Sequence, residues 1–122
     1  MIFIDATETD FPLKNAGKTM KVQELVKHLC DNYDYDNFVY LSFDDNTVFG
    51  SLKDSNISTD SGMVFIKAIR EEDSVEKIDF TMKVHHLVKL LKQLDNWDDV
   101  YFDLGDGSVY ANITKEKIVR KN

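Results

Sequence analysis

The stretch TMKVQELVKHL at residues 19–29 recurs as TMKVHHLVKLL at residues 81–91, 62 positions further along the chain. Both copies carry apolar residues at the i, i+3, i+4 and i+7 spacing of an amphipathic helix, and a threonine stands just before that spacing begins. Threonine is a favoured N-cap residue, so Thr19 and Thr81 are predicted to cap two helices that each bury one apolar stripe.

The repeat extends to both sides of this helix. MIFIDA at 1–6 falls on MVFIKA at 63–68 under the same shift, and after one residue is dropped near Phe38 a shift of 61 aligns 39–49 with 100–110. Self-similarity of this length indicates one supersecondary unit used twice. We therefore expect a single compact domain, residues 1–122, made by tandem duplication of units at 1–62 and 63–122.

Each unit is predicted to have the order ββαββ. The strands 1–6 and 63–69 would each pair with a second strand before the helix, near Lys14–Lys18 and Glu76–Phe80. Behind each helix, the dipeptides at 45–46 and 106–107 are typical of two-residue hairpin turns. The predicted fold class is α+β, an antiparallel sheet with both helices packed on one face and pseudo-twofold symmetry between the units.

A two-residue turn also sets the register of each hairpin, and the pairs that it places toward the helices are apolar or small. The predicted pairs are Phe43–Val48, Leu41–Gly50 and Val39–Leu52 in the first unit, and Leu104–Val109, Phe102–Ala111 and Val100–Ile113 in the second.

The same alternation predicts a second sheet face, turned away from the helices and exposed, with three aromatic residues from each unit. Three interpretations stay open. The aromatic residues could form cross-strand pairs on a partly solvent-exposed face, the faces of the two units could pack on each other, or the face could be an interface for another protein. The aromatic residues are Phe3, Tyr40 and Phe49 in the first unit and Phe65, Tyr101 and Tyr110 in the second.

The charge balance is acidic, at −7, in a chain with 43% hydrophobic and 30% charged residues. Residues 1–62 hold 5 Lys against 11 Asp and Glu, and residues 63–122 hold 10 Lys and Arg against 11. Such a chain repels phosphate backbones, so direct nucleic-acid binding is not expected, whereas a basic protein surface would attract it. The opening MIFIDATETD is no signal peptide and no apolar run is long enough to span a membrane, so a cytoplasmic location is expected.

The histidine, cysteine and aspartate residues do not form a catalytic or metal-binding pattern. His85 and His86 are adjacent on a helix and point about 100° apart, so they and His28 are expected on solvated helix surface. Cys30 is the single cysteine and aligns with the exposed Lys92; no pattern of nearby histidine or aspartate suggests an activated thiol. The aspartates do not have the spacing of a calcium loop. We expect no enzyme activity, no metal and no cofactor.

An acidic segment that includes residues 31–36 in the first unit links the helix to the next strand, and we call it the joint. The helix T-M-K-V-x-x-L-V-K-x-L, followed by the acidic joint and the Asp-Asn or Asp-Gly hairpin, resembles small uncharacterised proteins of bacteriophages and prophages. The resemblance covers about half of each repeat and implies a mobile-element origin without catalytic residues. The function expected is non-catalytic binding to a heterologous host protein, as in anti-defence inhibitors. Homo-oligomeric assembly, including a homodimer, and sequestration of a small ligand between the repeats remain alternatives. The candidate binding residues are Tyr33, Asp34, Tyr35, Asp36, Tyr40, Asp44, Phe49, Tyr101, Asp103 and Tyr110.

Overall fold

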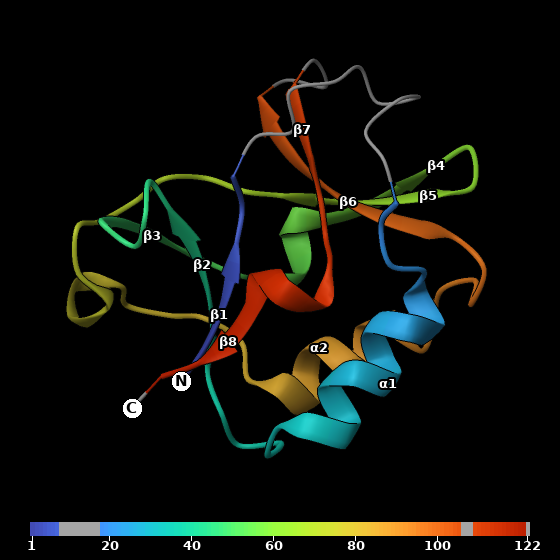
Figure 1. The fold of residues 1–122 in the computed structure, drawn as a ribbon, viewed down its shortest axis with the longest axis horizontal. Coiled ribbons are helices and arrows are strands. Elements are labelled where there is room, and N and C mark those ends of the chain that lie inside the picture. Colours follow the sequence, from blue (N-terminus) through green and yellow to red (C-terminus); the bar gives the residue numbers. More distant parts are fainter. Residues whose placement is uncertain (8–17, 106–108, 122) are drawn as a thin grey trace.

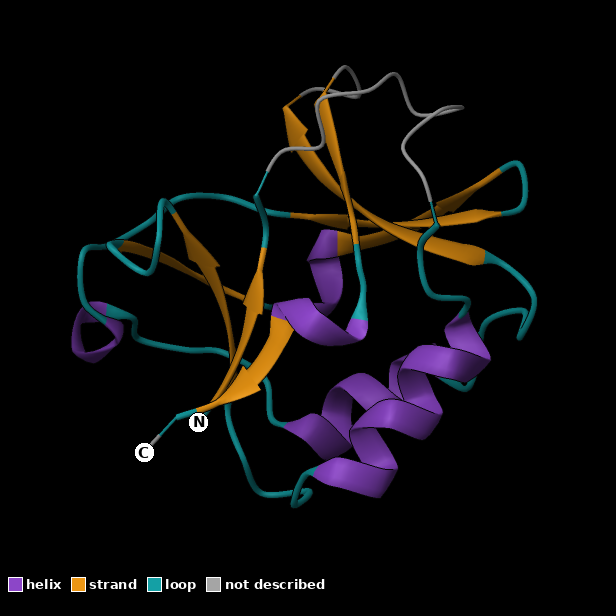
Figure 2. Ribbon diagram, in the orientation of Figure 1, coloured by secondary structure: helices purple, strands orange, loops and turns teal. Residues whose placement is uncertain are grey.

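The computed structural model describes residues 1–7, 18–105 and 109–121, which form two helices and two four-stranded mixed sheets (Figures 1 and 2). The predicted α+β class is confirmed. The first sheet has the order β3-β2-β1-β8 and the second β4-β5-β6-β7. The helices are α1 (Val22–Asn32) and α2 (Val84–Leu91); the strands are β1 (Ile2–Asp5), β2 (Val39–Phe43), β3 (Val48–Ser51), β4 (Ile57–Asp60), β5 (Met63–Lys67), β6 (Asp99–Gly105), β7 (Val109–Asn112) and β8 (Ile118–Arg120).

The two sheets are built in the same way from the two halves of the chain. In each, a strand, a helix and a second strand form a crossover, so that β1 pairs parallel with β2 and β5 pairs parallel with β6. The last strand of each half pairs antiparallel in the other half's sheet: β4 lies beside β5, and β8 lies beside β1. The predicted antiparallel pairing was therefore wrong for the two crossover pairs, β1 with β2 and β5 with β6, because a helix between two strands connects parallel neighbours directly.

The strand predicted before the second helix is also absent from its place. Residues Val75–Lys77 form a short 3-10 helix (η3), and the rest of Glu76–Phe80 is irregular. Of the corresponding prediction at Lys14–Lys18, residues 14–17 lie outside the described part of the chain. β4 occupies the position beside β5 in which this strand was expected to pair. Among the described residues of both halves, the additional strand therefore comes last, as β4 and β8.

The hairpin registers are largely as predicted. Phe43 lies opposite Val48, Leu41 opposite Gly50 and Phe102 opposite Ala111, which confirms three of the expected pairs. In the second hairpin the register shifts between Asp103 and Gly105, so Val109 pairs with Gly105 and the pair with Leu104 was wrong. The Asp106-Gly107 turn lies outside the described residues. In the first hairpin, residues 44–46 all have positive φ, between 50° and 67°.

Thr19 and Thr81 were predicted to be N-caps, and this prediction was wrong. Both are buried residues that connect the two halves of the chain. The caps are Lys21 and Lys83, two residues later. The Thr81 hydroxyl donates to the Val39 carbonyl and accepts from the Leu52 N–H at 2.8 Å, so it bridges the open ends of β2 and β3.

The other threonine makes the reciprocal bridge. Thr19 donates to the Val100 carbonyl and accepts from the Ile113 N–H at 2.9 Å, so it closes the hairpin of β6 and β7. Each hairpin is thus completed by a residue from the opposite half, and the predicted pairs Val39–Leu52 and Val100–Ile113 are held apart by the inserted segments.

The core lies between the two sheets and the two helices, which run side by side (Figure 2). The predicted apolar stripes are buried on both helices, and they pack on the inward-facing residues of both sheets in one continuous cluster. The fully buried members include Ile2, Ile4, Leu25, Leu29, Leu41, Ile66, Leu87, Leu91 and Phe102.

Removing the Thr81 hydroxyl is expected to destabilise the fold. The substitution Thr81→Val keeps the side-chain shape and leaves a buried carbonyl and a buried N–H without partners, which costs about 1–3 kcal/mol. Urea unfolding measures the loss. Thr59→Val, at an exposed position on β4, is the matched control and should change stability far less. Equal effects of the two substitutions would contradict the bridging role.

Candidate functional site

The predicted aromatic residues form two separate clusters, one on the outer face of each sheet. The Phe3 ring stacks on Tyr40 with centroids 5.8 Å apart and contacts Phe49 at 5.6 Å. In the second sheet Phe65 lies 6.3 Å from Tyr101 and 5.4 Å from Tyr110. The central ring of each set stands beside its neighbours across the strands, as cross-strand aromatic pairs do.

These faces are less exposed than predicted. Phe3 is only 5% exposed and Tyr101 only 8%, while Tyr40, Phe49 and Tyr110 are half-buried. The prediction of an exposed face was wrong for Phe3 and Tyr101, because the clustered rings cover one another and Lys121 lies over Phe3. The two faces do not pack on each other in the shared core, which is lined by the opposite faces of the sheets.

Residues 33–36, in the acidic joint after α1, consist of one tyrosine with a structural role and three exposed residues. The Tyr33 hydroxyl donates to the Ile118 carbonyl at 3.1 Å, and burial raises the pKa of this phenol. Tyr33 therefore ties the end of α1 to β8. Asp34, Tyr35 and Asp36 are exposed, Tyr35 by 55%.

Asp44 and Asp103 lie away from the joint, at the other ends of the strands. Asp44 follows β2 and pairs with Arg70 at 3.0 Å. Asp103, near the end of β6, accepts from the Gly105 N–H at 3.1 Å. The structure therefore divides the ten predicted binding residues among the joint, the two outer sheet faces and the carboxyl ends of β2 and β6.

Three of the exposed aromatic residues lie at a place that the sequence did not indicate. Tyr35, Phe38 and Phe80 are 55%, 43% and 58% exposed. Tyr35 and Phe38 lie on the segment that is hydrogen-bonded to the first turn of α2, and Phe80 lies four residues before this helix; we call the three residues the α2 patch. In Figure 1 the segment after α1 passes beneath this end of α2. Phe38 was missed because it stands where the repeat alignment drops a residue, and Phe80 because its segment was predicted to be a strand.

Hydrogen bonds to the α2 backbone hold the α2 patch in place. The Val84 N–H donates to the Asn37 carbonyl at 2.9 Å, and the His85 N–H donates to the Tyr35 carbonyl at 3.2 Å. The Lys83 ammonium lies 5.1 Å from the centre of the Phe38 ring. Joint and helix are thus fixed to each other, because these carbonyls satisfy N–H groups that the first turn of a helix leaves open.

A shallow groove runs beside Phe80 along α2. Its volume is about 310 Å³, and its walls are mostly apolar. The lining residues are Asp54, Phe80, Met82, His86, Lys89, Leu90 and Gln93. The groove extends the apolar surface of the α2 patch toward the end of the helix.

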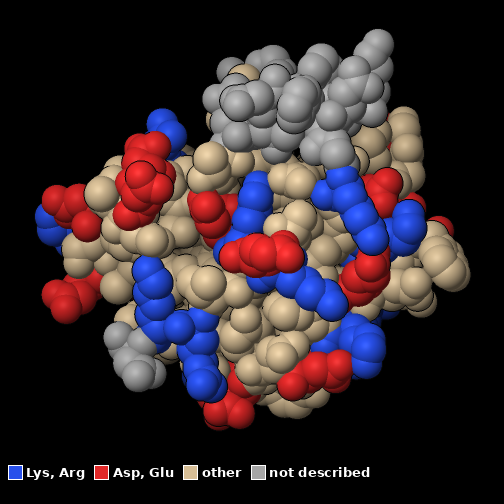
Figure 3. Space-filling view, in the orientation of Figure 1, with Lys and Arg blue, Asp and Glu red and all other residues tan. Residues whose placement is uncertain are grey.

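Charges of both signs lie around these features. Figure 3 shows acidic and basic side chains interspersed over the visible face. No group of three or more histidine, cysteine, aspartate or glutamate side chains is placed to hold a metal ion among residues 1–7, 18–105 and 109–121. Within the same residues, no helix has the length and apolar character needed to cross a membrane.

The prediction that His28 lies on solvated helix surface was wrong. His28 is half-buried and packs edge-on against the Tyr33 ring, with the ring centroids 5.7 Å apart. Its Nε2 is buried and has no hydrogen-bond partner among the described residues. Burial, with a smaller effect of Lys115, lowers the pKa of His28. His85 and His86 are exposed, as predicted, whereas Cys30 is half-buried.

Protonation of His28 is expected to destabilise the fold. Because its pKa is lowered in the folded state, the unfolded chain takes up this proton first, and stability falls as the pH drops below the ordinary value of 6.5 toward the lowered pKa. Below that second value the loss is complete. His28→Gln should remove this part of the pH dependence in urea unfolding, and the exposed His85→Gln should keep it. A His28→Gln curve parallel to wild type would contradict the prediction.

No protein-family model matches this chain, and neither a curated protein nor a solved structure matches it. The function is therefore inferred from the chain's own surfaces. Of these, the α2 patch combines exposed aromatic side chains with a fixed backbone.

Proposed function

We propose that this protein is a non-catalytic binding protein that docks on a heterologous protein through the α2 patch. The observation that carries the proposal is that three exposed aromatic residues lie on the two segments that meet at the first turn of α2, the joint after α1 and the approach to α2. A few residues supply most of the binding energy in a protein interface; aromatic side chains are frequent among interface residues, and the strongest contributors cluster near the centre of the contact.

The rigidity of the α2 patch supports the same function. Tyr35 and Phe38 lie on a segment whose carbonyls are bound by the first N–H groups of α2. A surface that is already ordered loses little conformational entropy when a partner binds. The groove beside Phe80 offers a recess for an apolar side chain of the partner.

The partner is proposed to present basic residues next to an apolar centre. Asp34 and Asp36 are exposed on either side of Tyr35 and take part in no ion pair within the part of the chain that the structure describes. The net charge of −7 would attract such a surface over a longer range. Charge attraction mainly accelerates association, and the aromatic contacts hold the complex together.

The biological setting that we propose is a phage-type accessory protein that inhibits a host protein, including one of host defence. The support is the resemblance of the helix and hairpin to small phage and prophage proteins. A small acidic protein that covers a basic functional surface blocks that surface without any catalysis.

We also propose that the chain arose by tandem duplication, with pseudo-twofold symmetry between its halves. The support is the equal order of elements, β1-α1-β2-β3-β4 and β5-α2-β6-β7-β8, together with the repeated sequence. The reciprocal threonine bridges also relate equivalent residues in the two halves. The unit would then have the order βαβββ in place of ββαββ.

Affinity capture from a bacterial lysate tests the binding function. Tagged wild-type protein is expected to retain one heterologous protein in a stoichiometric amount, and Tyr35→Ser/Phe80→Ser is expected to lose it. The matched control is Trp97→Ser. It removes another aromatic side chain, which is 68% exposed and lies in the segment that follows α2 in the sequence. Light scattering of the purified protein at rising concentration distinguishes the alternative: self-association that Tyr35→Ser/Phe80→Ser abolishes would favour assembly over host binding.

Charge reversal of the joint is expected to weaken the captured complex. Asp34→Lys/Asp36→Lys should lower the affinity at least about tenfold, which corresponds to about 1.4 kcal/mol. Asp60→Lys/Asp98→Lys changes the net charge equally and should have a smaller effect; Asp44 and Asp99 are unsuitable because each already forms an ion pair. Titration calorimetry at two salt concentrations measures both. Equal losses for the two double variants would show that only the overall charge matters.

A further inference from the structure

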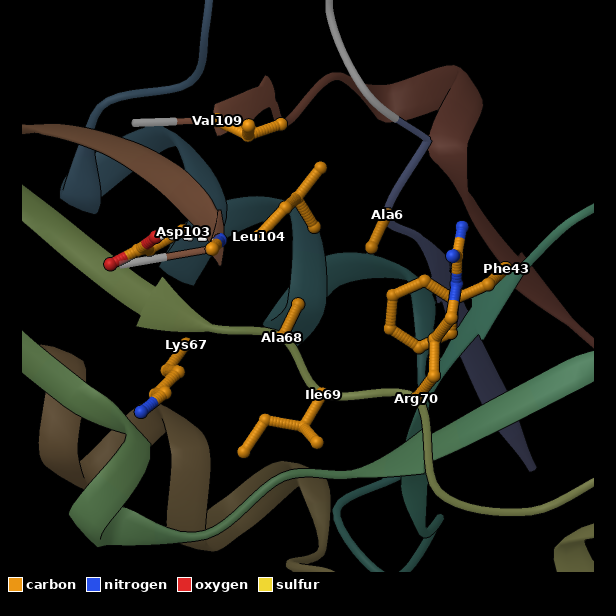
Figure 4. Close-up of a pocket in the computed structure, with 10 residues that line it drawn as sticks. Ala6, Phe43, Lys67, Ala68, Ile69, Arg70, Asp103, Leu104 and Val109 are labelled. Carbon is orange, nitrogen blue, oxygen red and sulfur yellow. Dashed lines mark hydrogen bonds between the residues drawn. The ribbon is translucent and has the colours of Figure 1, made fainter. Parts of the chain in front are cut away.

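A cavity of about 350 Å³ lies between the two sheets, where all four parallel strands end. Apart from Val109, the first residue of β7, its lining residues lie at the ends of β1, β2, β5 and β6 or shortly after them, so both crossovers open toward the same space. Figure 4 shows these residues converging from the two halves of the chain. In sheets with parallel strands, ligands bind outside the carboxyl ends of the strands. The volume falls within the range of small-molecule sites, roughly 300–1,000 Å³.

The apolar part of the cavity wall is formed by matching residues of the two halves. Ala6 and Ala68 occupy equivalent positions after β1 and β5, and their small side chains leave the centre open. Phe43 and Leu104 occupy equivalent positions on β2 and β6 and form facing sides.

Arg70 stands at the rim, with its side chain 62% exposed. Its guanidinium lies 5.4 Å from the centre of the Phe43 ring, and its Nη2 donates to Asp44 at 3.0 Å. The chain before it runs close to β3, where a Cβ on Gly50 would clash with the Ile69 carbonyl oxygen. A guanidinium held by one ring and one carboxylate still has further N–H donors, arranged in the planar fork that suits a second carboxylate.

The opposite side of the cavity carries a charge of each sign. Lys67 and Asp103 are partners across the parallel strands β5 and β6, and both line the cavity away from Arg70 (Figure 4). Each side of the cavity thus carries one basic and one acidic residue, because Arg70 is paired with Asp44. The chemical difference between the two sides is the guanidinium, whose remaining N–H donors can take a second carboxylate at the edge of an apolar space.

We propose that this cavity binds a small organic carboxylate, whose charged group meets Arg70 and whose apolar body lies against Ala6, Ala68 and Leu104. This site is separate from the α2 patch, because Phe38 precedes β2 and Phe43 ends it. Five residues of extended strand span roughly 13–17 Å. Loss of one function therefore leaves the other open to measurement.

Three probes of the same shape test the chemistry of the site: 3-phenylpropionate, 3-phenylpropan-1-ol and 3-phenylpropan-1-amine. Titrations of 15N-labelled full-length protein followed by NMR should show shifts at residues 6, 43, 67–70 and 103–105 for the carboxylate. We expect the carboxylate to bind at least about tenfold more tightly than the alcohol, as a charge-assisted hydrogen bond gives, and the amine to bind most weakly.

Two kinds of variant separate the contribution of the Arg70 charge from that of the cavity volume. Arg70→Gln should remove the preference for the carboxylate over the alcohol, and Arg120→Gln, which changes the other arginine of the chain at an exposed position on β8, should preserve it. Ala68→Leu should abolish binding by filling the cavity. Ile69→Trp, at a rim position that is 45% exposed, blocks the cavity without changing the buried core and serves if Ala68→Leu does not fold.

The proposal is overturned if the carboxylate causes no shifts at these residues at millimolar concentration. It is equally overturned if the alcohol or the amine binds as tightly as the carboxylate, or if Arg70→Gln and Arg120→Gln have the same effect. Binding that survives both Ala68→Leu and Ile69→Trp would place the ligand elsewhere on the molecule.

Discussion

The fold depends on the insertion of each half's segment before its helix into the open end of the other half's hairpin. Thr81 and Met82 satisfy the backbone at the end of β3 and the start of β2: the Met82 N–H donates to the Leu52 carbonyl at 2.9 Å, and the Met82 carbonyl accepts from the Val39 N–H at 2.9 Å. Thr19 and Met20 make the same bonds in the second sheet. Buried backbone groups need partners, so neither hairpin can close without residues from the opposite half.

This exchange also fixes the two helices. The first N–H groups of α1 donate to the Asp98 and Asn96 carbonyls at 2.9 and 3.1 Å, and those of α2 donate to the equivalent carbonyls in the joint after α1. Each helix therefore begins on the segment that follows the other helix. The α2 patch is a consequence, because it forms where the exposed side chains of that segment meet the approach to α2. The corresponding place beside α1 carries Trp97 but no second aromatic residue among the described positions.

The same arrangement directs the carboxyl ends of the parallel strands toward each other. Exchange of the final strands, β4 and β8, brings the two sheets to opposite sides of one core, and the cavity lies where β1, β2, β5 and β6 end. Two alanines keep it open and Gly50 brings Arg70 to its rim. The two proposed sites thus lie at opposite ends of β2, one at the start of the strand and one at its end.

The sequence by itself determined what depends on neighbours along the chain. The helical spacing of apolar residues placed both helices, the turn dipeptide set the first hairpin's register, and the repeat indicated that the second half is built like the first. Of the site, it identified Tyr35 with its flanking acids, but not Phe38 or Phe80. Only the tertiary structure decided the parallel pairing, the exchanged strands, the roles of the two threonines and the burial of Phe3 and Tyr101. The physical reason is that periodicity records which side of a segment is apolar, whereas the choice of partner depends on hydrogen bonds and packing between segments far apart in the chain.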